Sequence, residues 1–204
     1  MNKFRFEAFS DAVFAFAITL LVLGLALPEF RQGPTERELT QALLRLWPNL
    51  LAYALSFAVI AIMWQNHHAL FRLIHTVDRR TVFLNFLLLG VTVFIPFATS
   101  VLGAHPAMRA STFLYGLTLT ASSSAYLVLL MHLIRTRAFE AAVPEPTLRQ
   151  TLFAYRLGWA TYTAAMLCSL VAPRLSFALY LLVAVYFLVP RGLDTDLHPA
   201  RAGA

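Results

Sequence analysis

The sequence contains six apolar stretches, separated from one another by short segments rich in arginine, proline or polar residues. A helix rises about 1.5 Å per residue, so about 20 apolar residues are needed to cross the hydrocarbon core of a bilayer. These stretches predict an all-α polytopic membrane protein. We expect six transmembrane helices within residues 1–190, at about 4–28, 48–72, 81–102, 111–134, 148–171 and 175–189, followed by a cytoplasmic tail at 191–204.

Composition supports this class. Hydrophobic residues make up 59% of the chain and charged residues 13%, which excludes an ordinary water-soluble domain. The net charge of +6 would suggest nucleic-acid binding in a soluble protein. Here the arginines fall at the ends of apolar stretches, where they anchor helices against lipid headgroups. We therefore expect the lipid bilayer, and no nucleic acid, as a partner.

The distribution of basic residues predicts the orientation. Eleven of the 16 Lys and Arg residues lie in or near the N-terminus, the second and fourth loops and the C-terminal tail, all on one side of a six-helix topology. By the positive-inside rule, both termini are cytoplasmic.

Local signals refine the boundaries of the elements. Thr35 and Glu38 form a capping-box pattern that predicts a short interfacial helix ending near Trp47. Pro96 is expected to kink the third helix. The fifth stretch contains Arg156 and the sixth is short for a full crossing, so these two spans have the weakest boundaries.

Several polar residues fall at one depth, four to eight residues inside the arginines at the cytoplasmic ends of the first three helices: Ser10, Asp11, Trp64, Asn66, His67, His68 and Asn85. Arg5 and Asp11 are six residues apart and point to different sides of one helix, so each needs a partner elsewhere. Two interpretations stay open for this polar layer. It is a hydrogen-bonded set that fixes helix packing, or it takes part in proton movement or gating.

No pattern indicates an enzyme or a cofactor. A di-metal membrane enzyme needs several His and carboxylate clusters, whereas Asp11 is the single acid at the depth of His67 and His68. Catalytic triads, phosphate loops and paired carboxylates are absent from the sequence. The single cysteine, Cys168, has no partner for a disulfide within the chain, and we interpret it as a small core residue.

The first helix carries an apolar stripe with a hydroxyl beside it. Phe16, Leu20, Leu23 and Leu27 recur at helical spacing, and Thr19 lies next to them. From spacing alone, such a stripe faces lipid or the protein core.

Arg5, Phe9, Ser10 and Asp11 match an R-x-x-x-F-S-D pattern at the start of the first helix of the TMEM175 family of cation channels. The sequence resembles bacterial members of this family. The similarity continues through AVFAFAITLLVL, the segment WQNHHALFRLI, and DRR followed by Asn85 and the Pro96 region.

The resemblance implies a homotetramer in the bacterial plasma membrane, with four copies of the first helix around a pore for potassium ions. No TVGYG-type filter occurs in the sequence. By the same resemblance, Phe16 forms the narrowest ring, Leu20 and Leu23 form further pore-facing layers, and Thr19 tunes the preference for potassium over sodium. The family usually has Ile or Leu where this chain has Phe16. Either the gate is tighter at rest, or a small rotation places Leu20 at the constriction.

Two other functions remain open at this point. An acid and histidines at one depth are also compatible with a proton-coupled secondary transporter, although no inverted repeat is visible. A non-conducting membrane scaffold is compatible with the composition.

Overall fold

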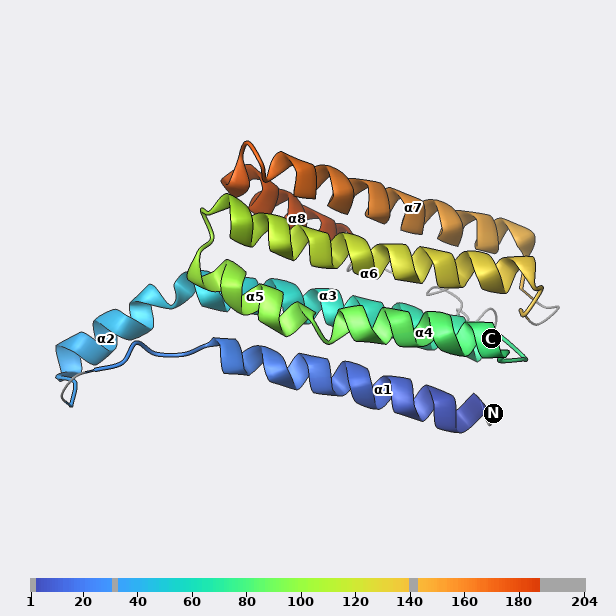
Figure 1. The fold of residues 1–204 in the computed structure, drawn as a ribbon, viewed down its shortest axis with the longest axis horizontal. Coiled ribbons are helices and arrows are strands. Elements are labelled where there is room, and N and C mark those ends of the chain that lie inside the picture. Colours follow the sequence, from blue (N-terminus) through green and yellow to red (C-terminus); the bar gives the residue numbers. More distant parts are fainter. Residues whose placement is uncertain (1–2, 31–32, 140–142, 188–204) are drawn as a thin grey trace, which may run out of the picture.

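The structure is a computed structural model that describes residues 3–30, 33–139 and 143–187 of the 204-residue chain. The predicted cytoplasmic tail at 191–204 lies outside these ranges. The regular structure within them is helical, as predicted, and Figure 1 shows the long helices lying side by side along one axis. The elements are α1 (Lys3–Leu20), the 3-10 helix η1 (Leu21–Gly24), α2 (Glu36–Arg45), α3 (Trp47–Arg72), α4 (Arg79–Thr92), α5 (Ile95–Ala104), α6 (Arg109–Arg135), α7 (Glu145–Cys168) and α8 (Pro173–Phe187).

The first apolar helix consists of α1 and η1 and ends at Gly24 rather than near residue 28. Its last turn tightens into a 3-10 helix, and Leu25 leaves the helical region with φ −93° and ψ 65°. A Cβ atom at Gly24 would lie 3.1 Å from the Cβ of Ser100, so the close approach of η1 to α5 favours glycine there. Leu27, expected in the helical stripe, therefore lies beyond the end of the helix and is 43% exposed.

The helix α2 begins at the predicted capping box. The Thr35 hydroxyl accepts a hydrogen bond from the Glu38 N–H at 3.3 Å, and the Glu38 carboxylate accepts one from the Thr35 N–H at 2.9 Å. These bonds to Thr35 hold the pKa of Glu38 below its usual value. The prediction of a short helix is confirmed, and α2 projects from one end of the bundle (Figure 1).

The third predicted helix, where a kink was expected at Pro96, is interrupted between α4 and α5 just before this residue. Pro96 has no N–H to donate to the carbonyl of Thr92, and its ring crowds the preceding turn. The Phe94 N–H bonds instead to the Val91 carbonyl at 3.1 Å, in the tighter 3-10 pattern. The two helices keep nearly one direction along the bundle (Figure 1).

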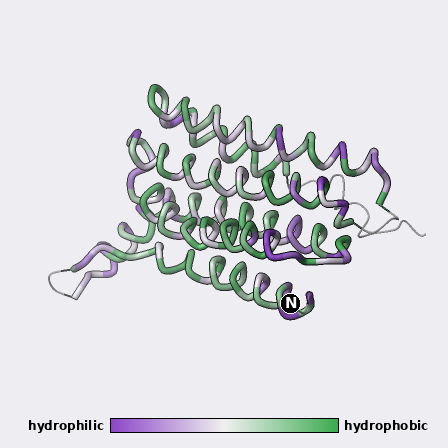
Figure 2. The backbone as a smooth tube through the Cα atoms, turned by 45° about the vertical axis from the view of Figure 1, so that its right-hand side comes forward, coloured by the Kyte–Doolittle hydropathy of each residue, from purple (hydrophilic) through white to green (hydrophobic). Residues whose placement is uncertain are grey.

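Within the described ranges, four helical segments are long and apolar enough to cross a membrane: Lys3–Gly24, Trp47–Arg72, Arg79–Ala104 and Arg109–Arg135. Figure 2 shows hydrophobic residues along the middle of the helices and hydrophilic residues in α2 and near the ends of the bundle. With 15 residues, α8 spans about 22 Å, less than the hydrocarbon core of about 30 Å. The chain is an all-α membrane protein, and the count of six crossings stays a prediction.

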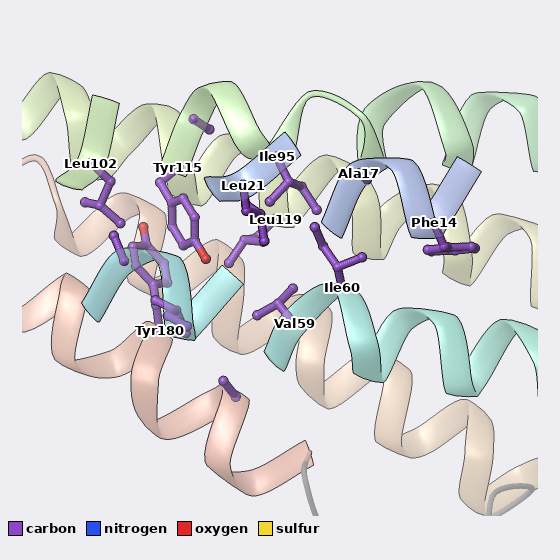
Figure 3. Packing of buried hydrophobic residues seen from close by; sticks show 14 of the residues in the cluster. Phe14, Ala17, Leu21, Val59, Ile60, Ile95, Leu102, Tyr115, Leu119 and Tyr180 are labelled. Carbon is purple, nitrogen blue, oxygen red and sulfur yellow. The ribbon is translucent and has the colours of Figure 1, made fainter. Parts of the chain in front are cut away.

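Buried apolar side chains form two clusters. One joins α1, α3, α5, α6 and α8 around Tyr115 and Tyr180, as Figure 3 shows. The other packs Phe6 of α1 and Phe71 of α3 against α4 and α6 near the N-terminal end of α1. Both clusters include α1, so the core holds one face of this helix along its length.

Candidate functional site

The helix α1, with η1, has one face packed into the bundle. Five residues spaced three or four apart are each 3% exposed or less: Phe6, Ser10, Phe14, Ala17 and Leu21. This spacing is that of a single helical face. Of the five, Ser10 alone carries a polar side chain, so its environment decides whether the face can be buried without cost.

The opposite face of α1 and η1 is exposed and largely apolar. Phe9 is 49% exposed, Phe16 is 67% exposed and Leu23 is 73% exposed, and Thr19 lies among them. Leu20 is half-buried, at the border between the two faces. Because α1 lies at the edge of the bundle (Figure 1), the described helices leave most of this face uncovered, and Phe86 of α4 contacts it at Phe9.

The Thr19 side chain is positioned by its own helix. Its hydroxyl donates a hydrogen bond to the Phe16 carbonyl at 2.8 Å. With the proton directed to the backbone, the oxygen lone pairs remain available on the exposed face.

A chain of hydrogen bonds anchors the buried face. Asn85 of α4 lies between Ser10 and His67, with Nδ2 donating to the Ser10 Oγ at 2.9 Å and Oδ1 lying 2.8 Å from the His67 Nε2. Because Oδ1 has no proton, the His67 Nε2 is the donor of the second bond. Ser10 in turn donates to the Phe6 carbonyl at 3.1 Å. The three side chains thus satisfy one another across α1, α3 and α4.

Aromatic packing fixes the imidazole of His67, which is 1% exposed. Its ring lies 4.3 Å from the Phe71 ring in a stacked arrangement and 5.3 Å from the Phe14 ring. His67 therefore bonds to α4 while its ring faces α1. The chain ends at a backbone carbonyl and passes through an amide that does not readily exchange protons, which favours a packing role over a proton path.

A second polar contact joins α1 to α3 beside this chain. The Trp64 indole Nε1 donates to the Asp11 Oδ1 at 2.9 Å, so the partner that Asp11 needs lies on another helix. The ring of His68 stacks on Trp64 at 5.7 Å, one turn further along α3. A bond to an ionised acceptor is stronger than one between neutral groups.

The remaining predicted residues lie around these contacts. Phe9 meets the Phe86 ring of α4 edge-on at 5.7 Å. Arg5 is exposed and has no ion pair among the described residues. Asn66 is buried and lines a crevice on the side of α3 that faces α6 and α7.

Asp78 caps the N-terminus of α4, on the same side of the bundle. It accepts a hydrogen bond from the Thr81 N–H at 2.7 Å and lies 3.3 Å from the His132 Nε2. The bonds from the Thr81 side chain and backbone, with a smaller contribution from His132, lower the pKa of Asp78 to about 2. The ionised carboxylate is thus the favoured form in the fold.

Sequence reasoning missed a second buried polar network. Thr99 of α5 donates to the Ser56 Oγ at 2.7 Å, and the Ser56 hydroxyl lies 2.9 Å from the Tyr115 OH of α6. The signal in the sequence was a hydroxyl residue in each of three apolar stretches. The sequence does not show which helices are neighbours, so it could not show that these hydroxyls lie at the same depth and meet.

In the part of the chain that the structure describes, no group of three or more His, Cys, Asp or Glu side chains is arranged to hold a metal ion.

The comparisons with known proteins agree on one family. A family model described as the endosomal/lysosomal potassium channel TMEM175 matches residues 5–96. Over 188 residues the chain is 38% identical to a potassium channel of Streptomyces collinus, covering 90% of each chain. The chain belongs to the TMEM175 family.

A solved TMEM175 structure supports the assignment. The crystal structure of a lysosomal potassium-selective channel TMEM175 homolog from Chamaesiphon minutus superposes with a TM-score of 0.81 at 34% identity, covering 91% of this chain and 96% of that one. The predicted resemblance is confirmed, and TMEM175 is an ion-channel family, not an enzyme family. The residues matched by the family model include most of α1 and all of α3 and α4, and so include Ser10, Asn85 and His67 as well as the Asp11–Trp64 pair.

Proposed function

We propose that this chain forms a potassium-preferring cation channel, in which four copies surround a pore lined by the exposed face of α1. The observation that carries the proposal is the contrast on α1 between a buried face, anchored by the hydrogen bonds of Ser10, and an uncovered, largely apolar face containing Thr19. The relatives from Streptomyces collinus and Chamaesiphon minutus, both named as potassium channels, support the permeant ion.

The gate in this proposal is a ring of apolar side chains. Narrow apolar segments oppose hydrated ions by dewetting, so conduction requires the ring to widen. The larger exposure of Phe16 compared with Leu20 supports Phe16 as the narrowest ring, with Leu23 as a further layer. Leu27 lies beyond η1, where it belongs to the mouth of the pore rather than to the helical stripe.

Thr19 supplies the polar element of this pore. Its hydroxyl donates its proton to the Phe16 carbonyl, and this bond leaves the oxygen lone pairs available to a cation. Four such oxygens at one level would contact a partly dehydrated cation, and the ring width would set the preference for potassium over sodium.

The polar layer has a positioning role. Ser10, Asn85 and His67 fix the rotation of α1 about its own axis, and the Asp11–Trp64 bond fixes the same helix against α3. A rotation of α1 that breaks these bonds would change which side chains face the axis. The bonds therefore connect the packing of the bundle to the width of the pore.

The proposal includes six crossings, with both termini in the cytoplasm of a bacterium and the channel in its plasma membrane. The distribution of Lys and Arg supports this orientation. In this arrangement α7 and α8 form the two remaining crossings, and the channel domain covers residues 1–190.

Purified protein in potassium-loaded liposomes tests the function. We expect potassium flux well above about 10³ ions per second per assembly, which exceeds an ordinary transport cycle. Mass photometry of the same sample should give four chains per particle. Flux below that rate would favour a proton-coupled transporter, and a tetramer without flux would favour a scaffold.

A further inference from the structure

A crevice separates α3 from α6, α7 and α8 on the side of α3 that faces away from α1. Its volume is about 70 Å³. Aliphatic and aromatic groups form most of its lining, including Val59, Met63, Leu119 and Phe187. Trp159, at the rim, is 39% exposed, so the crevice reaches the outer surface of the bundle.

A buried hydroxyl in this crevice lacks a partner. Ser122 is 2% exposed, and its Oγ has no hydrogen bond among the described residues. The neighbouring hydroxyls differ, since Ser123 donates to the Thr120 carbonyl and Ser124 accepts from the Trp159 indole. An unsatisfied buried polar group costs about 1–3 kcal/mol, so an occupant that bonds to Ser122 would be favoured.

The size and chemistry of the crevice select the occupant. A cavity needs about 10–15 Å³ of such volume to hold one water, so a crevice of about 70 Å³ has room for a molecule of about five heavy atoms. The lining favours an occupant with an apolar body, and the Ser122 hydroxyl favours one that also carries a hydrogen-bonding group. We propose that the crevice is a binding site for a small neutral amphipathic molecule of the short-chain alcohol class, with its hydroxyl on the Ser122 Oγ and its carbon chain directed toward Trp159.

The site lies directly behind the anchors of the pore helix. Met63 and Asn66 of α3 line the crevice, whereas the adjacent Trp64 and His67 contact α1 and α4. A molecule bound in the crevice would change the packing of α3 and, through it, the position of α1. Binding itself does not depend on conduction, whereas this regulatory effect rests on the proposed function.

Photolabelling with a diazirine derivative of butanol, 3-azibutanol, tests the binding site in the purified full-length protein. After irradiation, mass spectrometry should locate adducts on lining residues such as Tyr155, Trp159 and Tyr162, and excess butan-1-ol should suppress them. Adducts spread over exposed positions such as Phe83, without competition by butan-1-ol, would overturn the proposal.

Variants at Ser122 separate the hydroxyl from the space. Ser122→Ala should lower the labelling about fivefold at a probe concentration below saturation. Ser122→Thr keeps a hydroxyl at this position and should be labelled as the wild type is. Ser122→Leu should abolish it by filling the crevice. The matched control is Thr118→Val, because the Thr118 hydroxyl, one turn away on α6, already donates to the Leu114 carbonyl at 2.9 Å. Equal labelling of Ser122→Ala and the wild type would contradict the site. This result is expected if the Ser122 hydroxyl binds only an ordered water and not the probe.

Potassium flux supplies the second measurement. Butan-1-ol should change flux through the wild type, and Ser122→Leu should remove this response while Thr118→Val keeps it. If the wild type shows no potassium flux, the proposed function fails. The labelling result still decides whether the crevice binds the alcohol. If flux is present but Ser122→Leu responds as the wild type does, the regulatory effect is refuted.

Discussion

The two faces of α1 consist largely of apolar residues, yet they differ in what surrounds them. Phe14 on one face is fully buried against the His67 ring, whereas Phe16 on the other face is 67% exposed at the edge of the bundle. The buried face contains a serine whose hydrogen bonds are satisfied by Asn85 and by its own helix. The comparison teaches that α1 is held from one side by packing and hydrogen bonds, and that the proposed pore is placed on its uncovered side.

The largest effect is expected at the free face. Phe16→Ala removes the bulkiest side chain of the proposed ring, and lowering a barrier by about 1.4 kcal/mol raises a rate about tenfold. We expect resting potassium flux in liposomes to rise by at least this factor. Phe83→Ala is the matched control, because Phe83 is 69% exposed on α4 and should leave the flux unchanged. An unchanged flux in Phe16→Ala, together with a rise in Leu20→Ala, would place the constriction at Leu20.

At the anchored face, Asn85→Leu should give the second largest effect. It leaves the His67 Nε2–H without an acceptor and the Ser10 Oγ without a donor, with an expected loss of about 1–3 kcal/mol in the free energy of unfolding. Detergent-induced unfolding followed by circular dichroism measures this loss. Thr92→Val, which removes a buried hydroxyl bonded within α4, should cost clearly less. Equal losses would mean that the polar chain does not hold α1.

Asp11→Asn tests a half-buried residue at the border between the two faces of α1. The variant keeps an oxygen for the Trp64 indole but removes the charge, so about 0.5–1 kcal/mol of stability should be lost. We expect a lower yield of assembled particles by size-exclusion chromatography and altered potassium flux. Glu29→Gln, at an exposed carboxylate beyond η1, is the control. Normal assembly and normal flux in Asp11→Asn would show that the charge of Asp11 is not needed for either.

The smallest effect is expected at Asp78, outside both faces. Its pKa is lowered from 3.8 to about 2, so the carboxylate binds protons less readily in the folded state than in the unfolded state. Its contribution to stability is complete above pH 4 and is lost as the pH falls toward 2. The side chain is largely exposed, so the change is small. The melting temperature of the wild type should fall more between pH 4.5 and pH 2.5 than that of Asp78→Asn, and parallel curves would contradict this assignment.

The length of the apolar stretches was sufficient to predict the long helices, because segments such as Trp47–Arg72 must be helical to satisfy their backbone in lipid. The end of the first helix was predicted four residues too late. Its final turn is set by the contact between Gly24 and Ser100, which sequence spacing does not reveal.

The polar site was predictable in part. Counting residues from the flanking arginines placed Ser10, His67 and Asn85 at one depth, and the structure brings them into contact. The same counting could not separate His67, which bonds to Asn85, from Asn66, which lines the crevice, because adjacent residues point to different sides of a helix. It also gave no reason to single out Ser122. The lack of a hydrogen-bond partner for its buried hydroxyl among the described residues is visible only in the packed structure of α6 and α7.

The central claim is that the free face of α1 lines the ion path. The most direct test is block of potassium flux by silver ions, in a Cys168→Ala background, for single cysteines on the two faces. Thr19→Cys should be blocked by silver, and Ala17→Cys, at a position that is fully buried in the wild type, should not. Flux through Thr19→Cys that silver leaves unchanged, or equal block at both positions, would contradict the account.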